Sequence, residues 1–466
     1  MIKIQNKKFN NQLKKFIVAV LKVLRKEERK RTKIRKSQKE DIVWKENGHI
    51  IPIRQEYNFK PILLKSEKNI SSLKETKLLL NMIEKNQPMI ECSPRISINN
   101  NRKIKNSSYA RAFYSCHIHW LFISRLIQST QGLEFNQNIF DSLYSELEEF
   151  IYGKYDKFKV FVPLINFYSN IDNINIGNDI YIKKISEQEL RELWEISWGL
   201  NFRNHLNKIG WWICFIVKKE KQTNAVWSNP PSGINDTVEQ IITTLRLFKT
   251  GLLGTNFIYK IPLGWRKGSL HYSPADIDTI SVPVDICTPI INKDFGLFKE
   301  EVQKFQSFQR NMRSALQIKK MSKHTHVSVR RFNMAYERSR PIDKLLDYWI
   351  SFEALFGDSE GEMTYKVPLR ATYFIGESLD TFKDLKEWYA IRSYVVHGGI
   401  RNKRKEKVYL NKINQDINNL ENCVRRCLVQ YLHSGFSSKK KADVINEINR
   451  SIFDKRIKQE MALKQV

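Results

Sequence analysis

The residue types best suited to chemistry in this chain are an arginine and a histidine near the end of one predicted helix. Arg392 is followed directly by Ser393, and four residues separate Arg392 from His397, which comes just before Gly398 and Gly399. A guanidinium can hold two phosphate oxygens through paired hydrogen bonds, and an imidazole can transfer a proton near neutral pH. Arg392 and His397 are therefore a candidate catalytic pair.

The spacing of this pair is weak evidence by itself. Arginine and histidine occur at a similar spacing at three other places, Arg111/His117, Arg266/His271 and Arg426/His433. The context distinguishes Arg392 and His397, because a long predicted helix precedes them, a polar residue follows the arginine and two glycines end the helix.

Helical geometry sets a condition on this pair. Five residues of an ideal helix correspond to about 500° of rotation, so the two side chains start about 140° apart and about 7.5 Å along the axis. They converge only if the helix loosens at its end or if a second copy of the chain completes the site.

The helices that must position the pair are predicted at 341–356, 366–376, 380–397 and 414–434. Pro341 suits a first helical turn, and Gly357 ends the same apolar segment. Glu353 lies within this segment, where a carboxylate is costly unless it is paired. Glu353 and Arg370 are therefore candidate supporting residues, which pair with each other or orient Arg392.

The rest of the chain predicts an α+β fold with several domains, because a β-containing N-terminal and middle region precedes an all-α helical bundle. Apolar residues alternate as in strands at 158–165, 171–176, 180–185 and 211–217. This region carries no catalytic motif, and we interpret it as a sensing or scaffolding domain. The expected parts are a basic amphipathic helix or arm at 1–40, a mostly helical region at 41–154, the β-containing domain at 155–300, a basic linking helix at 301–328, the helical bundle at 329–436 and a basic helical tail at 437–466.

The formal charge of +30 indicates an anionic partner, either nucleic acid or an acidic membrane surface; the alternative is a solvated basic surface. The helix at 1–40 is open to three interpretations: a nucleic-acid arm, a membrane-surface helix, or a solvated helix docked on the body of the protein, which is the commonest case. Residues 302–336 contain lysine and arginine but no acidic residue, and a second basic run follows His397. The candidate RNA-binding residues are Arg310, Arg313, Lys319, Lys320, Lys323, Arg401, Lys403 and Arg404.

Neither a metal site nor a cofactor is expected. The six cysteines are scattered, and no histidine or second pair completes a zinc set with Cys423 and Cys427. The apolar run at 16–24 is too short to span a bilayer and lacks a cleavage site, so we expect a soluble, cytoplasmic protein with no membrane partner.

The segment 329–436 resembles a HEPN domain, of the ApeA-like HEPN group of bacterial anti-phage proteins. The resemblance covers about a quarter of the chain. It is carried by spaced elements in the expected order, at 330–338, 343–356, 369–371 and 391–398.

This resemblance implies a metal-independent endoribonuclease of abortive infection, in which the motifs of two protomers face each other across a cleft. Arg392 would bind the scissile phosphate, His397 would be the general acid and base, and Ser393 would assist with a hydrogen bond. The implied partners are RNA, a second copy of the chain or a larger homo-oligomer, and a phage-derived trigger. The alternative is a non-catalytic nucleic-acid-binding or regulatory protein whose HEPN-like domain serves only for dimerisation.

Overall fold

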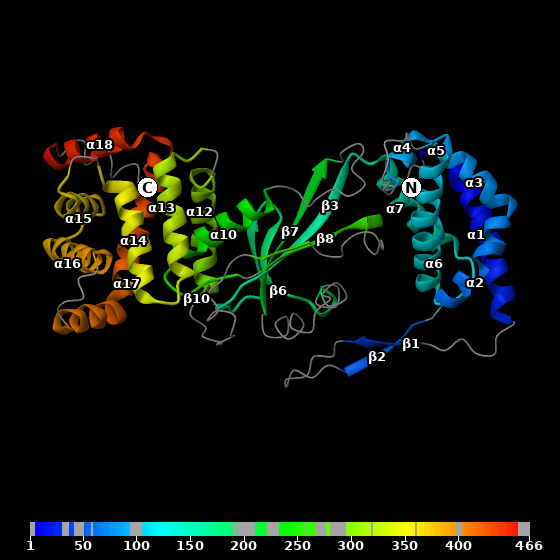
Figure 1. Ribbon diagram of the computed structural model, residues 1–466, viewed down its shortest axis with the longest axis horizontal. Coiled ribbons are helices and arrows are strands. Elements are labelled where there is room, and N and C mark those ends of the chain that lie inside the picture. The colour runs from blue at the N-terminus through cyan, green and yellow to red at the C-terminus, as the bar shows by residue number, and fades with distance from the viewer. Residues whose placement is uncertain are drawn as a thin grey trace.

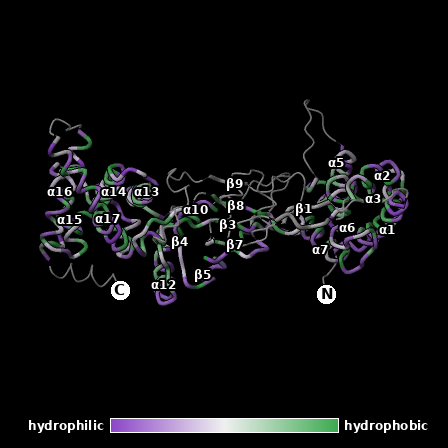
Figure 2. Tube along the Cα trace, turned by 90° about the horizontal axis from the view of Figure 1, so that it is seen from below, coloured by the Kyte–Doolittle hydropathy of each residue, from purple (hydrophilic) through white to green (hydrophobic). Residues whose placement is uncertain are grey.

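The structure is a computed structural model. An N-terminal helical part, a central sheet and a C-terminal helical bundle lie in a row along the long axis of the molecule (Figure 1), and a view turned by 90° shows the same succession (Figure 2). The predicted mixture of helices and sheet in an α+β fold is confirmed. The structure describes residues 5–29, 37–41, 51–56, 59–93, 105–189, 193, 210–220, 233–255, 257–266, 276–279, 295–317, 320–358, 361–397 and 403–454.

The N-terminal helical part has one apolar core. The long helix α1 (Lys7–Arg29) buries Phe9, Phe16 and Leu24 in this core, so it is docked on the body of the protein. The carboxylate of Glu148 accepts hydrogen bonds from the backbone N–H groups of residues 5 and 6 and fixes the start of α1. The other elements are β1 (Ser37–Asp41), β2 (Ile51–Glu56), α2 (Lys60–Ser72), α3 (Lys74–Glu84), α4 (Gln87–Glu91), α5 (Asn106–Phe113), the π-helix η1 (Tyr114–Phe122), α6 (Ile123–Thr130) and α7 (Gln137–Tyr152).

The central sheet has six strands in the order β5-β6-β7-β3-β8-β9, and all neighbouring strands are antiparallel. Val160 and Val162 point from β3 into the core under helix α10 (Ile234–Phe248), whereas Phe161 points to the opposite face. This alternation follows from the period of two in a strand. The strands are β3 (Tyr155–Pro163), β5 (Asn173–Gly177), β6 (Ile180–Lys184), β7 (Trp211–Glu220), β8 (Phe257–Pro262) and β9 (Asp276–Thr279), with a separate parallel pair β4 (Phe167–Tyr168) and β10 (Phe295–Gly296).

One tryptophan joins the sheet to the N-terminal helices. Trp265 lies on the short 3-10 helix η2 (Gly264–Arg266) after β8 and is buried in the N-terminal core. Its indole Nε1 donates a hydrogen bond to Nδ1 of His117 over 3.2 Å, and the guanidinium of Arg125 lies 5.2 Å from its ring centre. His117 and His119 are both buried.

The C-terminal bundle is built on α14 (Pro341–Phe356), which begins at the predicted proline and ends before Gly357. Trp349, Phe352 and Phe356 of α14 are completely buried in its core. The other helices are α12 (Lys299–Ala315), α13 (Lys323–Tyr336), α15 (Met363–Phe374), α16 (Leu379–Val396), α17 (Lys403–His433), η3 (Phe436–Ser438) and α18 (Lys441–Phe453).

Two expected boundaries differ from the observed ones. The basic linking helix expected at 301–328 is not one helix, because α12 ends at Ala315 and α13 begins at Lys323. The segment after residue 436 is not separate from the bundle, because Val444 and Ile448 of α18 are fully buried in the bundle core. Within the part of the chain that the structure describes, no helix is both long and apolar enough to cross a bilayer.

Candidate functional site

Arg392 on α16 is held by Glu353 on the neighbouring helix α14. Its Nη2 lies 3.2 Å from Oε1 and 3.4 Å from Oε2 of Glu353, and the two side chains are 20% and 23% exposed. This contact satisfies the carboxylate within the apolar helix, as the sequence requires, and it orients Arg392. The guanidinium therefore lies at the edge of the bundle, with solvent on one side and a fixed partner on the other.

Two further contacts support this pair. The guanidinium of Arg392 lies 5.8 Å from the ring centre of Tyr389, and this ring packs edge-on against buried Trp349 of α14. Lys441, at the start of α18, donates a hydrogen bond over 2.8 Å to the backbone oxygen of Glu353. Burial raises the pKa of Glu353, against the opposing effect of the positive charges of Arg392 and Lys441.

His397 lies directly after α16 and is exposed. Its backbone N–H donates to the oxygen of half-buried Ser393 over 3.0 Å, whereas its own φ and ψ of −91° and 11° lie in the bridge region, outside the helical range. The helical hydrogen bonds of α16 therefore continue up to His397, the last of them from its own N–H, and an ideal helix of this length places residue 397 about 140° around the axis from Arg392. Gly398 and Gly399 lie outside the described residues.

Arg370 does not pair with Glu353, contrary to one of the two arrangements expected for it. Its Nη2 forms a 2.7 Å ion pair with Asp358, its Nη1 donates to the oxygen of Phe356 over 2.8 Å, and its Nε donates to Asn449 over 3.0 Å. The side chain of Arg370 is only 6% exposed. Arg370 thus fixes the C-terminal end of α14 to α18, because the last turn of a helix leaves carbonyl groups without partners.

The basic residues of the predicted 302–336 ridge lie away from Arg392. Arg310 and Arg313 are on α12, which packs against α10, β5 and α17, whereas α16 is on the far side of the bundle (Figure 1). Lys320 and Lys323 are exposed at the break between α12 and α13. Lys319 lies outside the described residues. These positions do not form one surface with the Arg392 site.

The second basic run is closer in the chain to His397. Arg404 is exposed in the first turn of α17, and Lys403 is the first residue of that helix. Arg401 lies outside the described residues.

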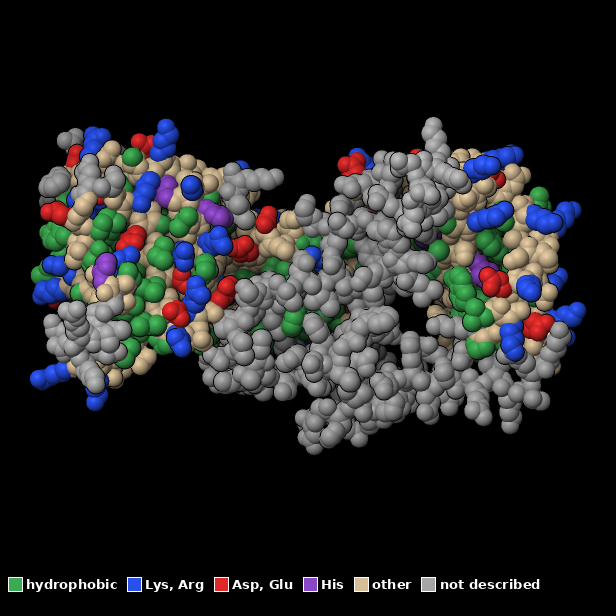
Figure 3. Space-filling model, in the orientation of Figure 1, with side chains coloured by type: hydrophobic (Ala, Val, Ile, Leu, Met, Phe, Trp, Pro, Cys, Tyr) green, Lys and Arg blue, Asp and Glu red, His purple; other side chains and the backbone are tan. Residues whose placement is uncertain are grey.

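Apolar side chains are exposed around the same end of α16. Val396, next to His397, is 50% exposed, and Val408 and Leu410 on α17 are 57% and 40% exposed. Leu379, at the opposite end of α16, and Tyr365 of α15, whose ring contacts Phe382 near that opposite end, are also exposed. The space-filling view shows hydrophobic side chains on the surface of this bundle between charged groups (Figure 3). Exposed apolar side chains gathered on neighbouring elements are typical of an interaction surface.

The segments that carry the resemblance also contain a buried ion-pair network, which the sequence did not reveal. Asp347 on α14, with a side chain 3% exposed, accepts from Arg331 over 2.8 Å and from Arg338 over 2.7 Å. Arg331 lies on α13 and Arg338 lies two residues after its end, so these contacts attach the C-terminal half of α13 and the residues that follow it to α14. The residues therefore maintain the bundle and do not reach Arg392.

A second network joins α13 to the sheet through Arg246 of α10. Its Nη1 donates to Oδ1 of Asn333 over 3.0 Å, its Nε and Nη2 donate to the oxygen of Leu253 over 3.1 and 3.0 Å, and its guanidinium lies 4.6 Å from the ring centre of Tyr336. Burial lowers the pKa of Arg246. These contacts hold the C-terminal end of α10 rigidly against the bundle.

Among the described residues, no group of three or more His, Cys, Asp or Glu side chains is arranged to hold a metal ion. Comparisons of the chain with family models, with curated proteins and with solved structures find no match. The function of the chain must therefore be inferred from its own residues and their geometry.

Proposed function

We propose that this chain is a metal-independent endoribonuclease of the HEPN type that acts in anti-phage abortive infection and cleaves RNA in a cleft between two copies. The observation that carries the proposal is the setting of Arg392. It is a partly exposed arginine, fixed by Glu353 and Tyr389, five residues before an exposed histidine at the same helix end.

The proposed reaction needs a group that holds the phosphate and a group that moves protons. The ribose 2′-hydroxyl loses its proton and attacks the adjacent phosphorus, the bond from phosphorus to the 5′-oxygen breaks, and that oxygen takes up a proton. The products are a 2′,3′-cyclic phosphate and a 5′-hydroxyl. Arg392 would hold the non-bridging oxygens as negative charge develops on them, His397 would exchange the protons, and Ser393 would assist with a hydrogen bond.

The geometry of α16 favours two copies over one. The backbone hydrogen bond from His397 to Ser393 keeps α16 closed up to its end, and on an ideal helix two residues at this spacing start about 140° apart, which favours a site completed by a second copy. A two-fold partner can bring its own histidine to the arginine of the first chain. The exposed Val396, Val408 and Leu410 supply apolar surface for such a contact.

Glu353 would hold Arg392 in place until a phosphate replaces it. The carboxylate is partly buried, and its raised pKa reflects an environment that disfavours its charge. A phosphodiester that enters the site therefore competes with a poorly solvated anion for the guanidinium.

The test is RNA cleavage in the presence of EDTA by the wild-type chain and by the variants Arg392→Ala and His397→Ala. We expect each variant to lose about 100-fold or more of the activity, the usual effect of removing a charge-stabilising or proton-transferring group. Arg426→Gln is the matched control, because Arg426 belongs to another Arg/His pair of the same bundle and forms an exposed ion pair with Glu377. Equal cleavage by all four proteins would refute the catalytic assignment.

A second candidate function rests on the same ion pair. Arg392 is already neutralised by Glu353, as expected of a structural arginine in a nucleic-acid-binding or regulatory protein that only dimerises through this face. Such a protein would bind RNA and form dimers without cleaving. Wild-type binding without strand scission, unchanged by His397→Ala, would favour this candidate over the ribonuclease.

A further inference from the structure

The outer face of α1 carries a continuous row of cations. Lys8, Lys15, Lys22 and Arg29 follow one another at intervals of seven residues, and all four side chains are exposed, as is that of Lys26. Seven residues are about 20° short of two helical turns, and Lys26 lies about five full turns after Lys8, so the five side chains share one face over about 31 Å. We call this face the α1 stripe.

The α1 stripe lies opposite the buried side of the helix. Fully buried Ile17 is about 180° around the axis from Lys8, and Phe16 and Leu24 belong to the same N-terminal core. Because the core holds this side of α1, the cations point away from the body of the protein. Figure 3 shows lysine and arginine side chains along the edge of the molecule that α1 forms in Figure 1.

The acidic residues of α1 do not interrupt the stripe. Glu27 and Glu28 are the only acids of this helix, and each lies about 100° or more around the axis from both Lys26 and Arg29. The helices packed against α1 add further positive charge. Their exposed charged residues on α2 and α3 are Lys65, Lys68, Lys74 and Lys77, against Glu67 and Glu84.

Two other cations of α1 have a structural role that the stripe residues lack. Lys14 lies 5.6 Å from the ring centre of Phe135, and Nε of Arg25 donates to the oxygen of Leu133 over 3.0 Å, so both attach α1 to the segment between α6 and α7. In the part of the chain that the structure describes, none of the five stripe residues forms an ion pair or a side-chain hydrogen bond. Their charges repel one another in a chain of formal charge +30, and an anionic partner would relieve this repulsion.

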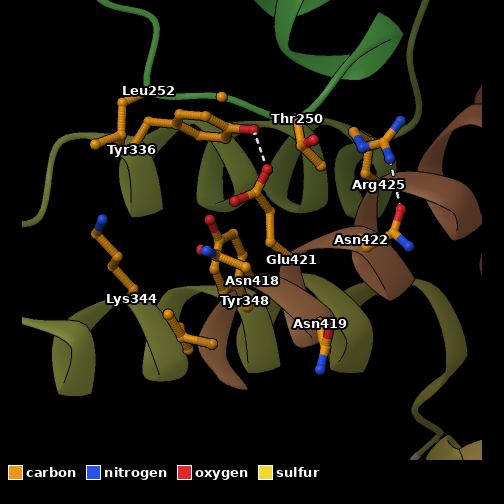
Figure 4. A pocket seen from close by; sticks show the side chains of 12 residues that line it. Thr250, Leu252, Tyr336, Lys344, Tyr348, Asn418, Asn419, Glu421, Asn422 and Arg425 are labelled. Carbon is orange, nitrogen blue, oxygen red and sulfur yellow. Dashed lines mark hydrogen bonds between the residues drawn. The ribbon is translucent and has the colours of Figure 1, made fainter. Parts of the chain in front are cut away.

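The cavity between the sheet and the bundle offers no comparable row of cations. It has a volume of about 720 Å³ and is lined by residues 250–252 and by side chains of α13, α14 and α17. Figure 4 shows Lys344 and Arg425 on opposite sides of Glu421, so an acidic side chain separates the two cations of this cavity. The α1 stripe is therefore the longer uninterrupted cationic surface of the two.

The chemistry of the α1 stripe fits the phosphate backbone of a nucleic-acid duplex. A duplex carries one negative charge per about 1.7 Å of its axis, a regular array that a straight row of cations can follow. A single strand gains much of its binding energy from aromatic rings on which bases stack, but Phe9 and Phe16, the only aromatic residues of α1, are buried. A bilayer surface would take up the apolar side of such a helix, and this side is already in the core.

We propose that the α1 stripe binds double-stranded RNA along its phosphates, without sequence preference. Lysine contacts with phosphates fix the position of a duplex and carry no information on its base sequence. The choice of RNA over DNA rests on the proposed function, whereas the stripe itself is separate from α16, which lies at the opposite end of the molecule (Figure 1). A duplex region of an RNA would thus be held far from the bond that is cut.

The experiment measures equilibrium binding of the full chain to a fluorescent 2′-O-methyl RNA duplex by anisotropy at several salt concentrations. This probe cannot be cleaved through its 2′-oxygen, so the result is independent of the proposed activity. We expect the variant Lys15→Gln/Lys22→Gln to bind about tenfold more weakly or worse, and its slope of log K against log salt to be smaller by about 2, because each lysine that leaves a phosphate lowers the slope by about 1. Lys15→Arg/Lys22→Arg should keep the wild-type slope, because both charges remain.

Lys154→Gln/Lys184→Gln is the matched control, because it removes the same charge from lysines beside the central sheet that are 66% and 55% exposed. This control should bind like the wild type. Equal affinity of the control and of Lys15→Gln/Lys22→Gln would overturn the proposal, as would failure of the wild-type chain to bind the RNA duplex. Tighter binding of the single strand or of a DNA duplex of the same sequence would overturn the assignment to double-stranded RNA. Binding of phosphatidylserine vesicles with the same dependence on Lys15 and Lys22, without binding of the RNA duplex, would assign the stripe to a membrane surface instead.

Discussion

Trp265 is the residue whose replacement should separate the N-terminal helices from the sheet. Its side chain is 2% exposed in the N-terminal core, and its ring centre lies 5.6 Å from that of Phe122. Replacement of a buried tryptophan by alanine costs about 3–5 kcal/mol, because apolar burial is lost and a cavity remains. We therefore expect Trp265→Ala to lower the free energy of unfolding of the N-terminal part by about 4 kcal/mol.

A conservative variant divides this effect into its components. Trp265→Phe keeps most of the apolar ring but loses the hydrogen bond to Nδ1 of His117, which contributes about 1 kcal/mol. It also weakens the contact with the guanidinium of Arg125, worth about 0.5–1 kcal/mol. We expect a total cost of about 1–2 kcal/mol for Trp265→Phe, well below that of the alanine variant.

Hydrogen exchange measured by mass spectrometry is the suitable assay, because it reports stability segment by segment. In Trp265→Ala the amides of α1, α5 and α7 should exchange faster, whereas those of α14 should keep the wild-type rate. Trp388→Ala is the reciprocal control, since Trp388 is buried in the core of the bundle. A Trp265→Ala chain with unchanged exchange in α5 and α7 would refute the role assigned to this residue.

Three further predictions concern charged residues. Asp347→Asn should lower the free energy of unfolding by about 2 kcal/mol, measured by urea denaturation, because two arginines lose a buried carboxylate. Burial opposes the charge of Glu189, but hydrogen bonds from Lys159, Lys183 and the backbone of Ser186 outweigh it and lower its pKa to about 2. A carboxyl group whose pKa is lowered on folding stabilises the protein at pH values above its ordinary pKa, and this stabilisation is lost as the pH falls through the lowered value. Glu189→Gln should therefore destabilise the protein at pH 7 and have little effect at about pH 2. Burial raises the pKa of Glu421, so its contribution to stability is present below the ordinary carboxyl range and is lost as the pH rises through the raised value. The Glu421→Gln variant should therefore gain stability relative to the wild type between pH 4.5 and pH 7. Urea denaturation midpoints of both proteins at these two pH values check this.

Local patterns in the sequence predicted the parts of the fold that depend on neighbours in the chain. The alternation of apolar residues located β3, β5, β6 and β7, because a strand exposes its two faces in turn. Pro341 and Gly357 marked the start and end of α14, because each residue type restricts or releases the backbone there.

Contacts between distant segments were not predictable in this way. The acceptor for Arg331 is sixteen residues away on another helix, and the cavity combines residues 250–252 with Arg425. Trp265 had no periodic pattern around it that would indicate burial. At the candidate site, the apolar setting of Glu353 did indicate a need for a partner, and the structure provides Arg392. For Arg370 the sequence left two options, pairing with Glu353 or orienting Arg392, and the structure instead pairs Arg370 with Asp358.

The attachment of Arg331 and Arg338 to Asp347 has a consequence for how the proposed activity is inherited. These residues stabilise the bundle through contacts that do not involve Arg392, Ser393 or His397. A descendant of this chain can therefore exchange the arginine or the histidine of α16 and still fold. If the chain pairs as proposed, such a descendant would still associate with an intact copy, and mixed pairs would contain one site or none. Gene duplication could in this way produce an inhibitor of the protein from the protein itself.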